Sequence, residues 1–193
     1  MLATTERSQR IVIGRNRESQ IADALVEQHG LKLEDASFSE DCFAKVDRWL
    51  LEGNKRTAMQ IKYRETGDDL LFEVYNKFDG WYGKNKQGRD MVGQSKLYAV
   101  LRQDRKTVVI TEVESAKRII AEMTRIARVT GWTQDNGEQN KRLTYVKHGF
   151  TCELRVQRDH GDGRTKMIAY IPVGLLQAET QTRVYTVNMP ANW

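Results

Sequence analysis

The strongest structural signal in this sequence is a pair of short apolar segments joined by a polar turn. The first covers residues 42–51 and the second covers residues 57–63. Each has the length and composition of a β-strand, so together they predict an antiparallel hairpin. Residues two apart on a strand share a face, and the hairpin would therefore gather Asp47, Gln60 and Lys62 on one patch.

These three side chains are a carboxylate, a neutral amide and an ammonium. Carboxylate and amide oxygens are ligands that Mg²⁺ accepts in proteins, and a metal-bound water is more acidic than a free one. Asp47 and the Gln60 carbonyl, with the backbone carbonyl of Ile61, would hold the ion. Lys62 would orient the attacking water or stabilise charge in the transition state. This chemistry suits hydrolysis of a phosphodiester.

The composition indicates a globular protein with an anionic partner. The chain has 193 residues, of which 39% are hydrophobic and 30% are charged, so it can bury a core. Its formal net charge of +5 favours an anionic partner, and nucleic acid is the commonest one.

Several classes of protein are disfavoured by the sequence. Cys42 and Cys152 lack the close spacing of zinc ligands, so no zinc site is predicted. Residues 1–10 are polar and do not resemble a secretion signal. No apolar run approaches the roughly 20 residues needed to span a membrane. We therefore expect a cytoplasmic protein with no membrane association.

A helix is predicted before the hairpin, over residues 17–28. Asn16 is a suitable N-cap, and Gly30 follows the last helical position as a stop signal. Glu18 lies one turn before the apolar residue Ile21, on the same side of this helix. The helix could therefore bring a second carboxylate towards the hairpin.

The remaining pattern predicts a mixed α/β protein. Residues 31–41 and 79–93 read as polar connections, and 114–128 has the apolar spacing of a helix. Further short strands are expected at 70–75, 96–101, 107–111 and 182–187. A hairpin is expected of strands 149–156 and 165–171, and a short helix at 172–177. The expected fold is α/β, with a central mixed β-sheet flanked by helices and a C-terminal β-rich extension.

The order of these features resembles the PD-(D/E)xK nuclease superfamily, which includes restriction-endonuclease-like and Holliday-junction resolvase-like enzymes. The resemblance covers about residues 15–130. It implies that Glu18 is the helical acid, Asp47 the central metal ligand, Gln60 the third ligand and Lys62 the lysine. The sequence departs from the motif in two places, with Val46 in place of the proline and Gln60 in place of an acid.

The resemblance also implies a restriction-endonuclease-like core over residues 1–132, with residues 133–193 as an extension packed on it. The implied activity is that of a Mg²⁺-dependent deoxyribonuclease cutting within DNA, with Mn²⁺ as an alternative ion. One such site cuts one strand, so double-strand cleavage or junction resolution would need a homodimer.

Two other functions are compatible with the same residues. A non-catalytic nucleic-acid-binding or regulatory protein could retain a degenerate nuclease fold, and Gln60 favours this alternative. A nuclease acting on RNA is another. Asp47 and Arg48 could also be ordinary strand-end charges, with Lys62 pointing to solvent, and Glu18 could serve the helix dipole. The other candidates for the helical or flanking acid are Glu27, Glu40 and Asp41. Glu73, in the middle of an apolar strand, could lie in the site or on the solvated face of the sheet.

Nucleic acid is expected to contact residues at the end of the hairpin and beyond it. Tyr63 and Arg64 directly follow Lys62 and could touch the scissile phosphate. A later stretch mixes basic and aromatic residues, which pair with phosphates and stack on bases. The basic residues proposed for this role are Lys84, Lys86, Arg89 and Lys96. The alternative is a solvated loop whose aromatic residues anchor it to the core.

Overall fold

The computed structural model describes residues 2–67, 69–78, 94–130, 141–158, 164–190 and 193. They form an α/β protein with three α-helices and ten strands. The chain divides into two compact units. The first comprises Met1–Gly67, Gln94–Ile110 and Arg183–Trp193, and the second comprises Asp68–Gly93 and Thr111–Thr182.

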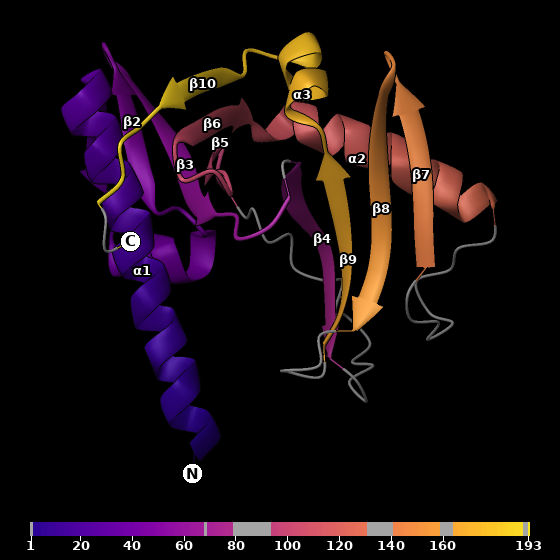
Figure 1. Cartoon of the computed structure of the whole chain (residues 1–193), viewed down its shortest axis with the longest axis horizontal. Helices are drawn as coiled ribbons and strands as arrows, with labels where there is room; N and C mark the ends of the chain where they lie inside the picture. The colour runs from indigo at the N-terminus through magenta and orange to yellow at the C-terminus, as the bar shows by residue number, and fades with distance from the viewer. Residues whose placement is uncertain (1, 68, 79–93, 131–140, 159–163, 191–192) are drawn as a thin grey trace. The chain divides into compact units, whose positions relative to one another are not determined.

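The first unit contains a six-stranded sheet in the order β1-β2-β3-β5-β6-β10. Its strands are β1 Lys32–Asp35, β2 Arg48–Glu52, β3 Lys55–Tyr63, β5 Leu97–Leu101, β6 Thr107–Glu112 and β10 Arg183–Thr186 (Figure 1). The β3–β5 pair is parallel, whereas β1–β2, β2–β3 and β6–β10 are antiparallel. The predicted mixed sheet and the predicted hairpin of β2 with β3 are therefore confirmed.

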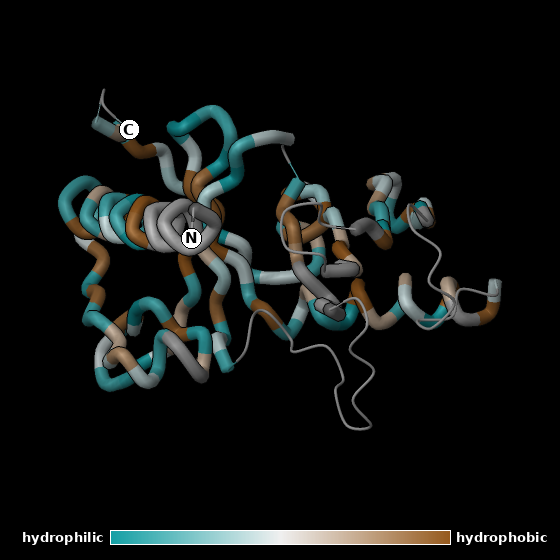
Figure 2. Tube along the Cα trace, turned by 90° about the horizontal axis from the view of Figure 1, so that it is seen from below, coloured by the Kyte–Doolittle hydropathy of each residue, from teal (hydrophilic) through white to brown (hydrophobic). Residues whose placement is uncertain are grey.

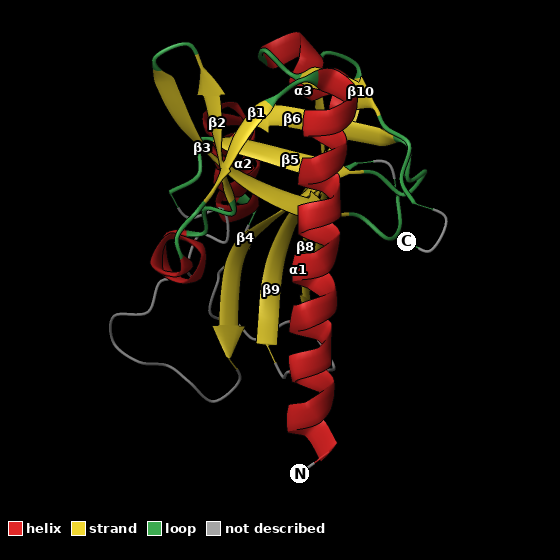
Figure 3. Ribbon diagram, turned by 90° about the vertical axis from the view of Figure 1, so that its left-hand side faces the viewer, coloured by secondary structure: helices red, strands yellow, loops and turns green. Residues whose placement is uncertain are grey.

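The helix α1, Leu2–His29, runs alongside this sheet (Figure 3). Its buried residues have the i, i+1, i+3, i+4 spacing of one helix face, and they are Ile21, Ala22, Ala24 and Leu25. They pack in one core with sheet residues that include Met59 and Ile61 of β3. Figure 2 shows brown, hydrophobic segments on both α1 and the strands beside it. Burying each large apolar side chain contributes about 1.5–3 kcal/mol, which fixes α1 on the sheet.

The start of α1 differs from the prediction, and its end does not. The helix begins at Leu2, so Asn16 lies inside it and is not an N-cap. Gly14 weakens a helix by only about 1 kcal/mol relative to alanine, which a helix of this length tolerates. The helix ends as predicted, because Gly30 takes a left-handed φ of +66° and its N–H donates to the Val26 carbonyl at 2.9 Å.

The segment before β2 also differs from the prediction. Residues Glu40–Ala44 form a π-helical turn, η1, so β2 starts at Arg48 rather than at residue 42. The strand β1 lies within what the sequence indicated was a polar connection. Most of its side chains are exposed at the edge of the sheet, so it lacks the apolar alternation by which strands are recognised.

The second unit contains a four-stranded sheet in the order β4-β9-β8-β7. Its strands are antiparallel: β4 Leu70–Phe78, β7 Lys141–Lys147, β8 Phe150–Arg158 and β9 Arg164–Ile171. The unit also contains α2, Val113–Val129, and α3, Val173–Glu179. Both helices and the β8–β9 hairpin confirm predictions, whereas β7 was not predicted.

The division into units follows a different line from the boundary predicted after residue 132. The strand β4 pairs with β9 of the second sheet, and β10 returns to the first sheet beside β6. Pairing between such distant segments leaves no local pattern in the sequence.

No helix in the described ranges combines the length and apolar character that a membrane crossing requires.

A candidate carboxylate–lysine site

Asp47 lies where the ladder between β2 and β3 ends. Its backbone N–H donates to the Met59 carbonyl at 3.0 Å. Its side-chain Oδ2 accepts the N–H of Ile61 at 2.7 Å, so the carboxylate takes the place of the next backbone partner. Asp47 is only 7% exposed. The local backbone therefore fixes the direction of this carboxylate.

Lys62 connects Asp47 to α1. Its Nζ lies 3.5 Å from Oδ2 of Asp47 and donates a hydrogen bond to Oε1 of Glu18. The three side chains come from α1, the start of β2 and the end of β3. The structure thus brings together three residues that the sequence predicted to share a site.

Gln60 belongs to the same neighbourhood by strand register. Arg48 pairs with Met59, so Asp47 falls beside Gln60. Gln60 and Lys62 lie on the same face of β3, because they are two residues apart. Gln60 is 4% exposed. Its amide adds a neutral polar group beside Asp47.

Burial dominates the electrostatics of the acids. It raises the pKa of both Asp47 and Glu18 above the ordinary values, although the Lys62 ammonium opposes the change. Burial lowers the pKa of Lys62, but the Asp47 and Glu18 carboxylates outweigh it and raise that pKa overall. The site thus holds a charged lysine between two carboxylates that are costly to ionise.

Two alternative acids lie in η1 and have other partners. Asp41 forms an ion pair with Arg15 at 3.0 Å, and its charge adds to the rise in the pKa of Glu18 and of Asp47. Glu40 accepts the N–H of Ser37 at 2.7 Å, which lowers its pKa. Asp41 therefore borders the site, and Glu40 organises the turn.

The other two alternatives lie elsewhere. Glu27 is exposed on α1, roughly 13 Å further along the helix axis than Glu18. Glu73 belongs to β4 in the second unit, and its side chain lies outside the described residues. Glu18 is thus the candidate helical acid that contacts Lys62.

Arg48 is a residue of this region that the sequence did not single out. Its guanidinium donates to the Asp47 carbonyl at 2.8 Å and to Ser19 Oγ on α1 at 3.1 Å, and it pairs with Asp35 of β1 at 3.0 Å. It therefore ties the backbone of Asp47 to the helix that carries Glu18. The sequence feature that could have indicated a role for Arg48 is its position directly after Asp47.

Three of the predicted nucleic-acid contacts are described. Tyr63 is half-buried at the edge of the core. Arg64 lies beside Gly67, where an added Cβ would come within 3.2 Å of Nη2. Lys96 is exposed just before β5, and its N–H donates to the Ala58 carbonyl at 2.8 Å. Lys84, Lys86 and Arg89 lie outside the described residues.

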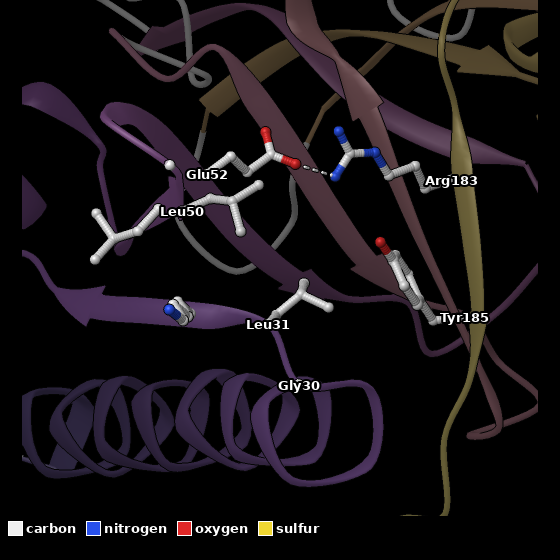
Figure 4. A pocket seen from close by; sticks show the side chains of 9 residues that line it. Gly30, Leu31, Leu50, Glu52, Arg183 and Tyr185 are labelled. Atoms are coloured by element: carbon white, nitrogen blue, oxygen red, sulfur yellow. Dashed lines mark hydrogen bonds and ion pairs between the residues drawn. The ribbon is translucent and has the colours of Figure 1, made fainter.

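A pocket of about 300 Å³ lies at the opposite end of β2 from Asp47. Leu31, Leu50 and Tyr185 are among the residues that line it (Figure 4). The ion pair of Arg183 with Glu52, at 2.6 Å, lies beside these apolar side chains. None of the predicted site residues lines this pocket.

The oxygen atoms of the site suit a hard divalent ion. Glu18 and Asp47 offer carboxylates, and Gln60 offers an amide oxygen, a donor set of the kind that Mg²⁺ shares with water and substrate. Within the described ranges, no group of three or more His, Cys, Asp or Glu side chains gathers as a metal cluster. An ion here would therefore rely on Gln60, on backbone carbonyls or on water to complete its coordination.

Comparisons of this chain with protein-family models, with curated proteins and with solved structures found no match. Any function assigned to it therefore depends on the residues and their geometry.

Proposed function

We propose that this protein is a metal-dependent endonuclease that hydrolyses phosphodiester bonds in DNA, with a PD-(D/E)xK-type site on a restriction-endonuclease-like core. The observation that carries the proposal is the contact of one lysine ammonium, that of Lys62, with both Glu18 and Asp47. Three elements separated in sequence supply these groups in the order that the nuclease motif requires.

The energetics of the cluster favour a functional role over a structural one. Removing charges from water is unfavourable, and well-packed apolar groups often serve stability equally well. Here Asp47 is 7% exposed and its pKa is raised by burial. Titratable groups perturbed by both burial and a specific charge partner concentrate at catalytic and binding sites.

The proposed chemistry assigns a task to each residue. Glu18, Asp47 and the Gln60 amide oxygen would hold Mg²⁺ or Mn²⁺. When bound, the ion neutralises charge on the phosphate and makes a bound water more acidic. The hydrogen bond from Ile61 holds Asp47 in a fixed direction. The Lys62 ammonium donates to a phosphoryl oxygen or to the attacking water as negative charge develops.

The cleavage test uses supercoiled plasmid DNA with Mg²⁺, Mn²⁺ or EDTA. We expect nicking that needs the metal and that falls at least about 100-fold in Asp47→Asn. Asp23→Asn is the matched control, because Asp23 is an exposed acid on α1. Binding of Mn²⁺, followed by its paramagnetic resonance, should weaken in Asp47→Asn and remain unchanged in Asp23→Asn. Equal cleavage by Asp47→Asn and the wild type would show that the assigned site is wrong.

A non-catalytic nucleic-acid-binding protein is the second candidate. Gln60 favours it, because a glutamine at this position gives the site one negative charge fewer than a third acid would. If the wild type binds DNA but cuts neither DNA nor RNA with either metal, this candidate replaces the nuclease.

A further inference from the structure

Two arginine–aromatic pairs flank the carboxylate–lysine site. The Arg15 guanidinium lies 5.9 Å from the centre of the Phe38 ring. The Arg17 guanidinium lies 4.9 Å from the centre of the Tyr63 ring and 5.9 Å from that of Trp193. All belong to the first unit.

The turn of α1 puts these pairs on opposite sides of Glu18. At roughly 100° per residue, Arg15 is displaced from Glu18 by about 60° in one direction and Arg17 by about 100° in the other. Tyr63 directly follows Lys62 along β3, so its side chain projects from the other face of the strand, where it meets Arg17 of α1. Phe38 lies in the turn that leads to Asp41, whose charge reaches both site carboxylates. Each pair thus contains an arginine of α1 within one helical turn of Glu18.

Phe38 is the part of this arrangement that packing does not explain. It is 72% exposed. A phenylalanine ring with that exposure contributes little to the core, and its free face is available to a flat ligand. Tyr63 and Trp193, in contrast, meet edge to face at 5.5 Å and pack against the core. Tyr63 and Trp193 therefore form a packed aromatic surface, whereas the Phe38 ring is exposed to solvent.

The arginines of both pairs have exposed acidic partners. Arg15 pairs with Asp41 and Arg17 pairs with Glu65, each at 3.0 Å. The Glu65 side chain is 73% exposed. Exposed ion pairs of this kind are weak. A phosphate, which a guanidinium can bind through two parallel hydrogen bonds, can displace such a partner.

We propose that these two pairs are subsites for unpaired nucleotides, one on each side of the carboxylate–lysine site, so that the substrate is a nucleic-acid strand with unpaired bases. This deepens the proposed function and rests on it. Aromatic rings stack on any unpaired base, whereas the bases of a duplex are already stacked on one another. The neighbouring guanidiniums would take the phosphates of the same nucleotides.

The test is binding without cleavage, in EDTA. Fluorescence anisotropy is measured with labelled oligo-dT and with a blunt hairpin duplex at one fixed salt concentration. We expect the single strand to bind at least about tenfold more tightly than the duplex. Phe38→Ala should weaken single-strand binding by about tenfold, the size of effect typical of losing one stacked ring. It should fold normally, because Phe38 is 72% exposed.

Two variants control for structure and for charge. Trp193→Phe keeps a ring on the core platform and should retain most of the binding. Arg155→Met removes a similar pair in the second unit, where the Arg155 guanidinium lies 4.5 Å from the centre of the Tyr170 ring. Arg155→Met and Arg15→Met each remove one positive charge. Only Arg15→Met should weaken single-strand binding severalfold.

Equal affinity for the two DNAs, or an unaltered affinity in Phe38→Ala, would overturn the inference even if the wild type cuts DNA. Single-strand binding that depends on Phe38 would support it even if no metal promotes cleavage. In that case the nuclease proposal alone would fail.

Discussion

Each unit of the molecule holds a lysine between two carboxylates, and the two clusters behave in opposite ways. In the first unit Lys62 contacts Glu18 and Asp47, and burial raises the pKa of both acids. In the second unit Lys147 lies 3.0 Å from Glu122 and 3.1 Å from Glu179. There the pKa of each acid is lowered.

The difference lies in whether burial or hydrogen bonding dominates the pKa of each acid. The Lys62 side chain is 37% exposed and that of Lys147 is 20% exposed, so the lysines do not explain it. Asp47 is 7% exposed, whereas the Glu122 side chain is 40% exposed. Hydrogen bonds from Tyr145 and Lys147 lower the pKa of Glu122 more than burial raises it. At Glu18 and Asp47 burial raises the pKa more than Lys62 lowers it.

The largest expected difference between the clusters is in activity. Lys62→Met should reduce the rate of DNA nicking at least about 100-fold, because the developing charge on the phosphate loses its ammonium donor. Lys147→Met removes the same group from the second unit and should cut DNA at nearly the wild-type rate. Initial rates on supercoiled DNA in Mg²⁺ make the comparison. Similar rates for the two variants would remove the distinction between the clusters.

The next effect is on stability. Lys62→Met leaves two nearby carboxylates without their cation, and we expect a loss of about 1–3 kcal/mol in the free energy of unfolding, less than for a fully buried pair. Lys147→Met should lose under about 1 kcal/mol, because the Glu122 side chain is 40% exposed. Urea unfolding without metal, monitored by circular dichroism, measures both. A larger loss in Lys147→Met than in Lys62→Met would show that burial does not make the Lys62 cluster more dependent on its lysine.

A smaller effect should follow from adding a carboxylate to the site. Gln60→Glu should lower the Mg²⁺ concentration needed for half-maximal cleavage by about tenfold, since the charge of the ligands tunes affinity for a hard ion. Gln177→Glu is the control, because Gln177 is exposed on α3. An unchanged Mg²⁺ requirement in Gln60→Glu would place Gln60 outside the coordination sphere.

The smallest effect concerns pH. Because the pKa of Glu122 is lowered on folding, its contribution is present above the ordinary glutamate pKa and disappears as pH falls through the folded value. Glu122→Gln should therefore flatten the loss of stability between roughly pH 5 and pH 3. We expect a change under about 1 kcal/mol. Thermal melts of Glu122→Gln and the wild type across this range should show it.

Local patterns predicted much of this structure. The β2–β3 hairpin, α2, α3 and the β8–β9 hairpin all have apolar spacing that matches their period, so single segments were enough to indicate them. The edge strand β1 and the first half of α1 lack that spacing and were missed. The positions of β4 and β10 in their sheets depend on partners far away in the sequence.

The candidate site divides in the same way. The sequence indicated Asp47, Gln60 and Lys62, because alternation along two adjoining strands is a local rule. It left the helical or flanking acid open among Glu18 and three alternatives, since no local rule measures the distance from a helix to a strand.

The residue types and their spacing were thus sufficient to predict an α/β chain with a carboxylate, an amide and a lysine on one hairpin. Only tertiary packing selected Glu18, because the core formed by Ile21 and Leu25 against Met59 and Ile61 fixes the position of α1 on the sheet. Packing also determined the pKa values of the site acids. The pKa of Asp47 depends on burial, which is a property of the folded chain and not of any segment of it.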